Sequence, residues 1–200
     1  MGDVITEVIA PKWLVSEQLV QACQDGSPEA QRELYECYKA KVYSLVVYLT
    51  GDLEMARDLT QEIFLKVFRD LRSFRFESSF NSWLYRLATN TCLNAIRSRR
   101  TRREVEIGEV IGTPAEIDAN SWLERQQVDQ SIQRAVRKAI LSLKPPLRAV
   151  IVLRYVENLS YSEIAQALSC SEGTVATRLS RAHRLLERKL KSGAAGIGSS

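Results

Sequence analysis

The stretch that decides the fold is SYSEIAQALSCSEGTVATRLSR, residues 160–181. It begins with a capping box, because Ser160 and Glu163 are spaced so that each side chain can accept a hydrogen bond from a backbone N–H at the helix start. A tight turn follows, and Ser171 can cap a longer second helix. This spacing predicts a helix-turn-helix, in which the small side chain of Ala165 lets the two helices cross closely.

The second helix of this unit has two chemically different faces. Its apolar residues recur at steps of three and four, as on a helix packed against a core: Val175, Leu179, Ala182, Leu186 and Leu190. The other residues carry hydroxyl and guanidinium groups: Thr174, Thr177, Arg178, Arg181, Arg184 and Arg188. Arginine can read guanine in the major groove or hold phosphate, so this helix predicts DNA binding. A solvated basic helix in a bundle is the plainer alternative.

Helical periodicity extends over the rest of the chain, and strand signals are nearly absent, so the predicted fold is all-α. The helices expected in the first half of the chain lie near 17–23, at 28–50, at 53–71 and at 80–99, with a break at 74–79. Their ends are marked by capping and stop residues: Ser27, Gly51 and Asp52.

Two further helices are expected before the helix-turn-helix. Ser121 and Glu124 form a second capping box. The helix that begins there has an apolar stripe: Val128, Ile132, Val136, Ala139 and Leu143. Two prolines at 145–146 break this helix, and another is expected at 147–157.

Charge and composition divide the chain. Residues 104–128 contain one Arg and six Asp/Glu, whereas 129–200 contain 12 Lys/Arg and five Asp/Glu. The acidic segment also contains two glycines and a proline and follows no sustained period, which is typical of a linker. Four parts are therefore predicted: a helical domain at 16–103, a flexible acidic linker at 104–120, a helix-turn-helix domain at 121–191 and a disordered tail at 192–200.

The overall composition excludes several classes of protein. Of the 200 residues, 45% are hydrophobic and 26% are charged, which rules out wholesale disorder. No apolar run reaches the roughly 18 residues of a bilayer crossing, and the N-terminus has no secretory signal, so a cytoplasmic protein without membrane insertion is expected. The four cysteines are far apart and are expected to be small buried residues rather than disulfide partners. A single histidine, His183, predicts neither a metal site nor a catalytic triad, and no cofactor is expected.

Two separate sets of motifs resemble one family. LKPPLRAVIVLRYVENLSYSEIA at 143–165 and SEGTVATRLSRA at 171–182 resemble region 4 of the extracytoplasmic-function (ECF) sigma factors. DLTQE at 58–62 resembles region 2.2 of the same family, and FNSWLYRLATN at 80–90 resembles region 2.3, with NAIR at 94–97 continuing into region 2.4. The resemblance implies a bacterial transcription initiation subunit that recognises two promoter elements and opens the duplex.

The resemblance also implies the partners. They are core RNA polymerase, through the clamp helices of its β′ subunit and through its β subunit, then promoter DNA, and an anti-sigma factor that holds the protein inactive. Asp58, Gln61 and Glu62 share one helical face because their spacing is i, i+3 and i+4. The resemblance assigns this face to the β′ clamp helices, whereas the residues alone favour a solvated helix surface.

Recognition of the −10 element is assigned by the resemblance to a polar–aromatic loop and the helix after it. A flipped base held in such a loop can return the unstacking energy through stacking and hydrogen bonds. The residues implied are Arg75, Phe76, Ser78, Trp83, Arg86, Asn90, Asn94, Arg97 and Arg100. Phe74 and Phe80 are expected to be core anchors, and the five arginines at 97–103 to add salt-sensitive affinity for phosphate. The family often has Asp where Asn94 stands, so the role of that position is open.

Recognition of the −35 element is assigned to the start of the last helix. The residues implied are Gly173, Thr174, Ala176, Thr177, Arg178, Ser180 and Arg181. Arg181 ranks first and Arg178 second as contacts. Ala176 is commonly basic in the family, and its methyl group cannot reach guanine or phosphate, so an atypical −35 preference is expected.

Two other functions are compatible with the residues alone. The first is an ordinary helix-turn-helix regulator that binds a palindromic operator as a dimer, with residues 1–103 as its sensor or dimerisation unit. The second is a helical nuclease, for which Asp58 and Glu62 are the only paired carboxylates that could help to hold a metal ion.

Overall fold

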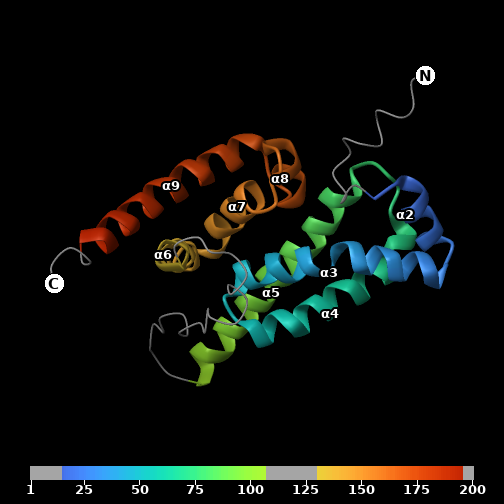
Figure 1. The fold of residues 1–200 in the computed structure, drawn as a ribbon, viewed down its shortest axis with the longest axis horizontal. Coiled ribbons are helices and arrows are strands. Elements are labelled where there is room, and N and C mark those ends of the chain that lie inside the picture. The colour runs from blue at the N-terminus through green and yellow to red at the C-terminus, as the bar shows by residue number, and fades with distance from the viewer. Residues whose placement is uncertain (1–14, 107–129, 196–200) are drawn as a thin grey trace.

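The computed structural model describes residues 15–106 and 130–195, and all regular structure in these ranges is helical. The first range contains α2 (Glu17–Gln24), α3 (Pro28–Thr50), α4 (Leu53–Asp70), the 3-10 turn η1 (Leu71–Ser73) and α5 (Phe80–Glu106). The second range contains α6 (Gln130–Leu141), α7 (Pro145–Tyr155), α8 (Tyr161–Ala167) and α9 (Glu172–Ala195). In Figure 1, α3, α4 and α5 lie together, and α7, α8 and α9 form a second group. The predicted all-α fold is confirmed.

The ends of the first helices follow the capping residues of the sequence. Ser27 Oγ accepts a hydrogen bond from the backbone N–H of Ala30 at 3.2 Å, and Asp52 Oδ1 accepts one from Met55 at 3.0 Å. Between the two helices, Gly51 has a φ of 75°, a left-handed conformation that glycine adopts without a steric cost. One residue therefore ends α3, and the next residue caps α4.

The helix-turn-helix forms as its spacing predicts. Both bonds of the capping box at Ser160 are present at the start of α8. The backbone N–H of Cys170 donates to the carbonyl of Ala165 at 3.0 Å and closes the turn. Ser171 Oγ then accepts from the N–H of Thr174 at 3.2 Å and caps α9. Ala165 is only 8% exposed, as expected of a small residue between crossing helices.

Three predicted boundaries are wrong. Helix α5 continues to Glu106, so residues 104–106 are helical rather than part of a linker, because arginine propagates a helix well. Helix α9 continues to Ala195, into the predicted tail. Helix α7 begins at Pro145 and ends at Tyr155, whereas the predicted helix covered residues 147–157. Pro145 can start the helix because the first turn does not use its missing N–H. The rest of the predicted linker, and the capping box of Ser121 and Glu124, lie outside the described residues.

Helix α3 is the centre of the N-terminal part. Its side chains at Leu34, Tyr38 and Val42 are at most 1% exposed. Ile63 of α4 and Leu84 of α5 are fully buried against it. Each such side chain contributes roughly 1.5–3 kcal/mol through removal from water. This core holds α4 and α5 side by side, so the outer surfaces of the two helices keep a defined position.

The cysteines do not all follow the prediction. Cys23 and Cys92 are buried, as expected, but Cys37 is exposed and Cys170 is half-buried. All four are free thiols. The prediction is wrong for Cys37 because this residue lies on the outer face of α3, one position before the buried Tyr38.

The apolar stripe of the last helix is buried only over its first half. Val175, Leu179 and Ala182 are at most 1% exposed, Leu186 is half-buried and Leu190 is 36% exposed. In α6, Ala139 is buried but Val136 is 38% exposed, so that part of its predicted stripe is wrong. Val128 and the side chain of Ile132 lie outside the described residues. Leu143, in the turn after α6, is 3% exposed.

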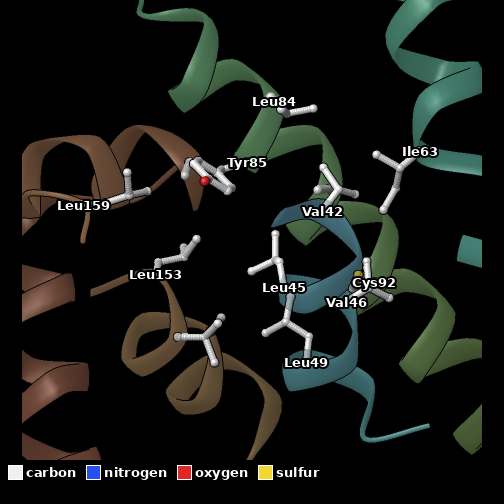
Figure 2. Close-up of a cluster of buried hydrophobic side chains, with 14 of the residues drawn as sticks. Val42, Leu45, Val46, Leu49, Ile63, Leu84, Tyr85, Cys92, Leu153 and Leu159 are labelled. Carbon is white, nitrogen blue, oxygen red and sulfur yellow. The ribbon is translucent and has the colours of Figure 1, made fainter. Parts of the chain in front are cut away.

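The two helical parts pack against one another. Helix α8 lies against α5, while α6 and α7 lie against α3. Figure 2 shows Leu45 and Leu49 on the side of α3 that faces Leu153 of α7, and all three side chains are at most 1% exposed. The guanidinium of Arg148, on α7, donates to the carbonyl oxygen of Leu49 across this contact. A single apolar cluster therefore extends through both parts.

Candidate nucleic-acid interface

The acidic face of α4 points away from the core. Asp58, Gln61 and Glu62 are all exposed, as their shared face requires. Glu62 forms an ion pair of 2.5 Å with Lys66, one turn later, whose ammonium also donates to Thr91 of α5. The structure thus brings together the three residues that the sequence assigned to one surface.

Leu65 extends this acidic face and was missed by the sequence reasoning. Its side chain is 73% exposed, the largest value among the exposed large hydrophobic residues of the described ranges. It stands seven positions after Asp58 and four after Gln61, so the helical period places it on the same face. The signal that could have found it is an apolar residue at the i+7 position of a polar stripe.

The loop before α5 is built on a cluster of aromatic rings. Phe74 and Phe80 are buried, as predicted, and the ring centroid of Phe74 lies 5.3 Å from that of Trp83. Trp83 is itself only 9% exposed. The indole of Trp83 is packed between other rings and presents little surface, so its assignment to DNA contact stays a prediction that this burial does not favour.

The exposed part of this loop has a strained backbone. Phe76 has a φ of 57°, which is unusual for a residue with a large side chain, and the residue is 37% exposed. Its ring centroid lies 4.9 Å from that of Phe74, so the exposed Phe76 packs against the buried cluster. Arg75 is exposed beside it and Ser78 is half-buried. These three residues have the stacking and hydrogen-bonding groups that a base pocket requires.

A side chain of α2 fastens the start of the loop. Gln24 Nε2 donates to the carbonyl oxygens of Leu71 at 2.9 Å and Phe74 at 2.7 Å. The loop ends where Ser79 Oγ accepts from the N–H of Ser82 at 3.1 Å and caps α5. The sequence reasoning missed Gln24, since nothing in its local pattern indicates a partner 50 residues away.

Helix α5 presents a polar line to solvent. Arg86, Asn90, Asn94 and Arg97 are all exposed and step along one face. Asparagine can read base edges and arginine can hold phosphate, so the line has the chemistry of a DNA-contacting helix. The side chain of Arg100 lies outside the described part of the structure.

One of the neighbouring arginines is already engaged within the protein. Arg99 Nη1 lies 2.5 Å from Asp52 Oδ2, which caps α4. This hydrogen bond holds the pKa of Asp52 below its usual range. The expectation that Arg99 supplies affinity for phosphate stays a prediction, and the ion pair with Asp52 would compete with such a contact.

The start of α9 exposes most of the predicted −35 residues. Gly173, Ala176, Thr177, Ser180 and Arg181 are exposed, and the hydroxyl of Thr177 donates to the carbonyl of Gly173 at 2.8 Å. This bond leaves the lone pairs of Thr177 available to an outside donor.

Two residues of the same segment are less available. Thr174 is half-buried, and its hydroxyl lies 2.9 Å from that of Ser171. Arg178 is half-buried and directs Nη1 towards the Cys170 sulfur at 3.9 Å. The order of importance predicted from the sequence, with Arg181 before Arg178, is consistent with this placement.

Other kinds of site were sought in the same ranges. Residues 15–106 and 130–195 contain no group of three His, Cys, Asp or Glu side chains arranged to hold a metal ion. His183 is paired with Tyr155, whose hydroxyl lies 2.9 Å from Nε2. None of the helices in the described ranges has the length and apolar character of a membrane span.

The comparisons with known proteins agree with the two sets of motifs. The family model "Sigma-70 region 2" matches residues 34–102, and "Sigma-70, region 4" matches residues 133–186. The chain is 36% identical to the RNA polymerase sigma-H factor of Pseudomonas aeruginosa, with 88% of this chain and 93% of that protein covered. It is 30% identical to the ECF RNA polymerase sigma factor SigW of Bacillus subtilis, with 89% and 98% covered.

Solved structures share the fold. The sigma factor RpoE in complex with the anti-sigma factor NepR, from Bartonella quintana, has a TM-score of 0.68 at 23% identity, with 80% of this chain and 96% of that chain covered. CnrH, solved with the cytosolic domain of CnrY, has a TM-score of 0.65 at 21% identity, with 88% and 96% covered.

The chain belongs to the sigma-70 family of RNA polymerase sigma factors, in its ECF group. This membership places it among transcription initiation factors. Of the three functions compatible with the residues, it favours the initiation factor over the palindrome-binding regulator and the nuclease.

Proposed function

We propose that this protein joins core RNA polymerase in the cytoplasm and directs it to promoters, as a binding subunit without catalytic activity of its own. The observation that carries the proposal is the coexistence of three exposed polar surfaces on one helical protein. They lie on α4, α5 and the start of α9, and each has different chemistry. A polymerase contact and two separate DNA contacts require such a set.

The contact with polymerase is assigned to α4. Asp58, Gln61 and Glu62 offer two carboxylates and an amide to basic side chains, and Leu65 adds apolar surface beside them. Interfaces of this kind combine an apolar anchor with a charged rim. By the resemblance, the surface that receives this face is the pair of clamp helices of the β′ subunit.

The −10 element is assigned to the loop at 74–79 and the exposed line of α5. Phe76 and Arg75 would stack on a base drawn out of the duplex, while Asn90 and Asn94 would contact base edges. Arg97 would hold phosphate near the end of this line. In this assignment Trp83, which is 9% exposed, supports the aromatic cluster beneath the loop.

The −35 element is assigned to the start of α9. In a helix-turn-helix, the second helix enters the major groove and its first turns contact base edges. Thr177, Ser180 and Arg181 have the exposure that this geometry requires. Ala176 offers only a methyl group, which suits contact with thymine. By the same family relationship, the β subunit would contact the C-terminal part, and an anti-sigma factor such as those in the two similar complexes would regulate the protein.

The test is reconstitution with purified core polymerase. The full chain is mixed with core enzyme, and RNA 5′ ends are mapped on genomic DNA, with core enzyme alone as the control. The proposal predicts discrete start sites that share two upstream elements and that depend on the added chain. Absence of binding to core enzyme, together with binding to a palindromic site as a dimer, would support the simple regulator instead.

A further inference from the structure

The single histidine of the chain lies on α9, next to the residues assigned to the −35 element. His183 is exposed and stands two positions after Arg181. The hydroxyl of Tyr155, at the end of α7, lies 2.9 Å from His183 Nε2, and the two ring centroids are 5.5 Å apart. Tyr155 is itself 57% exposed, so the pair is open to solvent at the surface of the C-terminal part.

Tyr155 can hold the imidazole in the same orientation in both protonation states. A tyrosine hydroxyl donates to Nε2 of a neutral imidazole whose proton is on Nδ1, and it accepts from the Nε2–H of an imidazolium. In both states Nδ1 carries a proton that an outside acceptor can use. Protonation of His183 therefore adds a positive charge without a change of partner inside the protein.

The charged groups on the elements around this pair do not neutralise it. The carboxylates have other partners: Glu163 of α8 accepts from Ser160, Glu187 of α9 pairs with Lys191, and Glu157, before α8, accepts from Tyr85. The cations of the same elements include Arg134, Arg137 and Lys138 of α6, Arg148 and Arg154 of α7, and Arg181, Arg184 and Arg188 of α9. Within residues 15–106 and 130–195, Tyr155 is the one side chain that is hydrogen-bonded to the imidazole. An external anion is therefore the group that can pair with a protonated His183.

The position of His183 along α9 places it at the edge of a bound groove. Ala176, Ser180 and His183 share one flank of the helix, because they are separated by four and three residues. At a rise of about 1.5 Å per residue, His183 lies about 10 Å beyond Ala176 along the helix axis. The major groove is about 12 Å wide, and phosphates border it. When the first turns of α9 contact base edges, His183 therefore lies close to the phosphate backbone.

We propose that His183, held by Tyr155, is a phosphate contact of the −35 site whose protonation strengthens promoter binding at acidic pH. The proposal rests on the proposed function. A neighbouring phosphate favours the imidazolium, so the binding of DNA and the binding of a proton support each other. Contacts with phosphate carry no sequence information, and pH should therefore change the affinity for promoters without changing which bases are preferred. Tyr155 acts through His183 and is a positioning residue.

The first test measures binding of the full chain, assembled with core polymerase, to a promoter fragment that contains a mapped start site. Between about pH 8 and about pH 6, where a histidine gains its charge, the affinity should rise about threefold to fivefold more for the unaltered protein than for His183→Gln. His183→Arg should bind at about pH 8 as tightly as the unaltered protein at about pH 6, because the charge of arginine is permanent. Tyr155→Phe should reduce the pH dependence, since the imidazole loses its partner. Lys39→Gln is the control, as it removes an exposed charge of α3 and should leave the pH dependence unchanged.

The salt dependence of the same binding identifies the contact as one with phosphate. The slope of the logarithm of the affinity against the logarithm of the salt concentration should be steeper by about 0.9 at the acidic pH than at the basic pH. This difference should be absent in His183→Gln. The ratio of affinities for promoters with and without a substitution in the −35 element should be the same at both pH values.

Nuclear magnetic resonance of the full chain gives a readout that does not depend on transcription. Because the chain has one histidine, its imidazole C–H signals are unambiguous. The pH at which these signals have shifted halfway should rise when a short mixed-sequence duplex is added at low salt. A halfway point that the duplex does not move would overturn the proposal, and so would an equal pH dependence of binding in the unaltered protein and His183→Gln. If the chain directs no transcription, the proposed function fails, whereas the imidazole signals still test the contact between His183 and phosphate.

Discussion

Arg99, near the end of α5, lies 2.5 Å from Asp52, the residue that caps α4. One carboxylate thus accepts from the N–H of Met55 at the helix start and from a guanidinium of the neighbouring helix. Asp52→Ala should lower the free energy of unfolding by about 1 kcal/mol, mainly through loss of the cap. Asp52→Asn retains a capping oxygen and should cost less, because a half-exposed ion pair contributes little. Urea unfolding of both variants measures the free energy contributed by the helix cap and that contributed by the ion pair with Arg99.

The same pair predicts a dependence of stability on pH. The hydrogen bond from Arg99 is the main cause of the lowered pKa of Asp52. Because the pKa is lower in the folded state, the stabilisation is present above the ordinary pKa of an aspartate and is lost as the pH falls through the lowered value. The difference in stability between the unaltered protein and Asp52→Asn should therefore shrink on acidification. A constant difference over that range would contradict the assignment.

Binding to core polymerase should depend on the acidic face and on Leu65. Gln61→Ala combined with Glu62→Ala should weaken core binding about tenfold or more, with the helical circular-dichroism spectrum unchanged. Leu65→Ala should weaken it by several-fold, because exposed apolar surface is lost. Arg57→Ala is the control, as it alters an exposed residue of the same helix. Loss of the helical signal in the double variant would mean that the face has a structural role.

Promoter recognition should distinguish two arginines of α9. Arg181→Ala should weaken binding to the −35 element by about 1–3 kcal/mol and relax its specificity at one position. Arg178→Ala should have a smaller effect, because that side chain is half-buried beside Cys170. Binding of holoenzyme to promoters with single substitutions in the −35 element provides the comparison. Equal footprints for Arg181→Ala and the unaltered protein would refute a base contact.

The thiols should differ in reactivity. Cys92 is fully buried, and burial raises the pKa of its thiol to about 12, so the native protein should not react there. Cys37 is exposed and should be labelled first by a maleimide. Mass spectrometry of peptides after brief labelling, with and without urea, gives the order. Early labelling of Cys92 without urea would show that α5 opens locally.

The sequence predicts the helices well because their ends are set by local chemistry. Ser27, Asp52 and Ser160 bond to backbone groups three positions away, and such short-range geometry is visible in the residue pattern. The acidic face of α4 is predictable for the same reason, since the helical period alone brings its members together. Their assignment to polymerase stays a prediction, as do the residues assigned to DNA.

The contacts between distant segments could not be predicted in this way. Trp83 lies on a face that could be core or surface, and the aromatic rings around it come from another helical turn and a loop. The bond from Tyr85 to Glu157 depends on how two helical parts meet, which no local period encodes. Arg99 was assigned to DNA because five arginines suggest a polyanion, whereas its partner Asp52 lies 47 positions earlier.

Gly51 gives the framework a fixed angle between two long helices. The chain reverses at this one left-handed residue, and Asp52 caps α4 directly after it. The connection therefore has no further residue that could adjust its backbone if Gly51 were replaced. A side chain at position 51 would strain the left-handed backbone, and relief of that strain would change the angle between α3 and α4. Asp58 and Glu62, two to three turns further along α4, would then be displaced on the face assigned to polymerase, although neither had been altered.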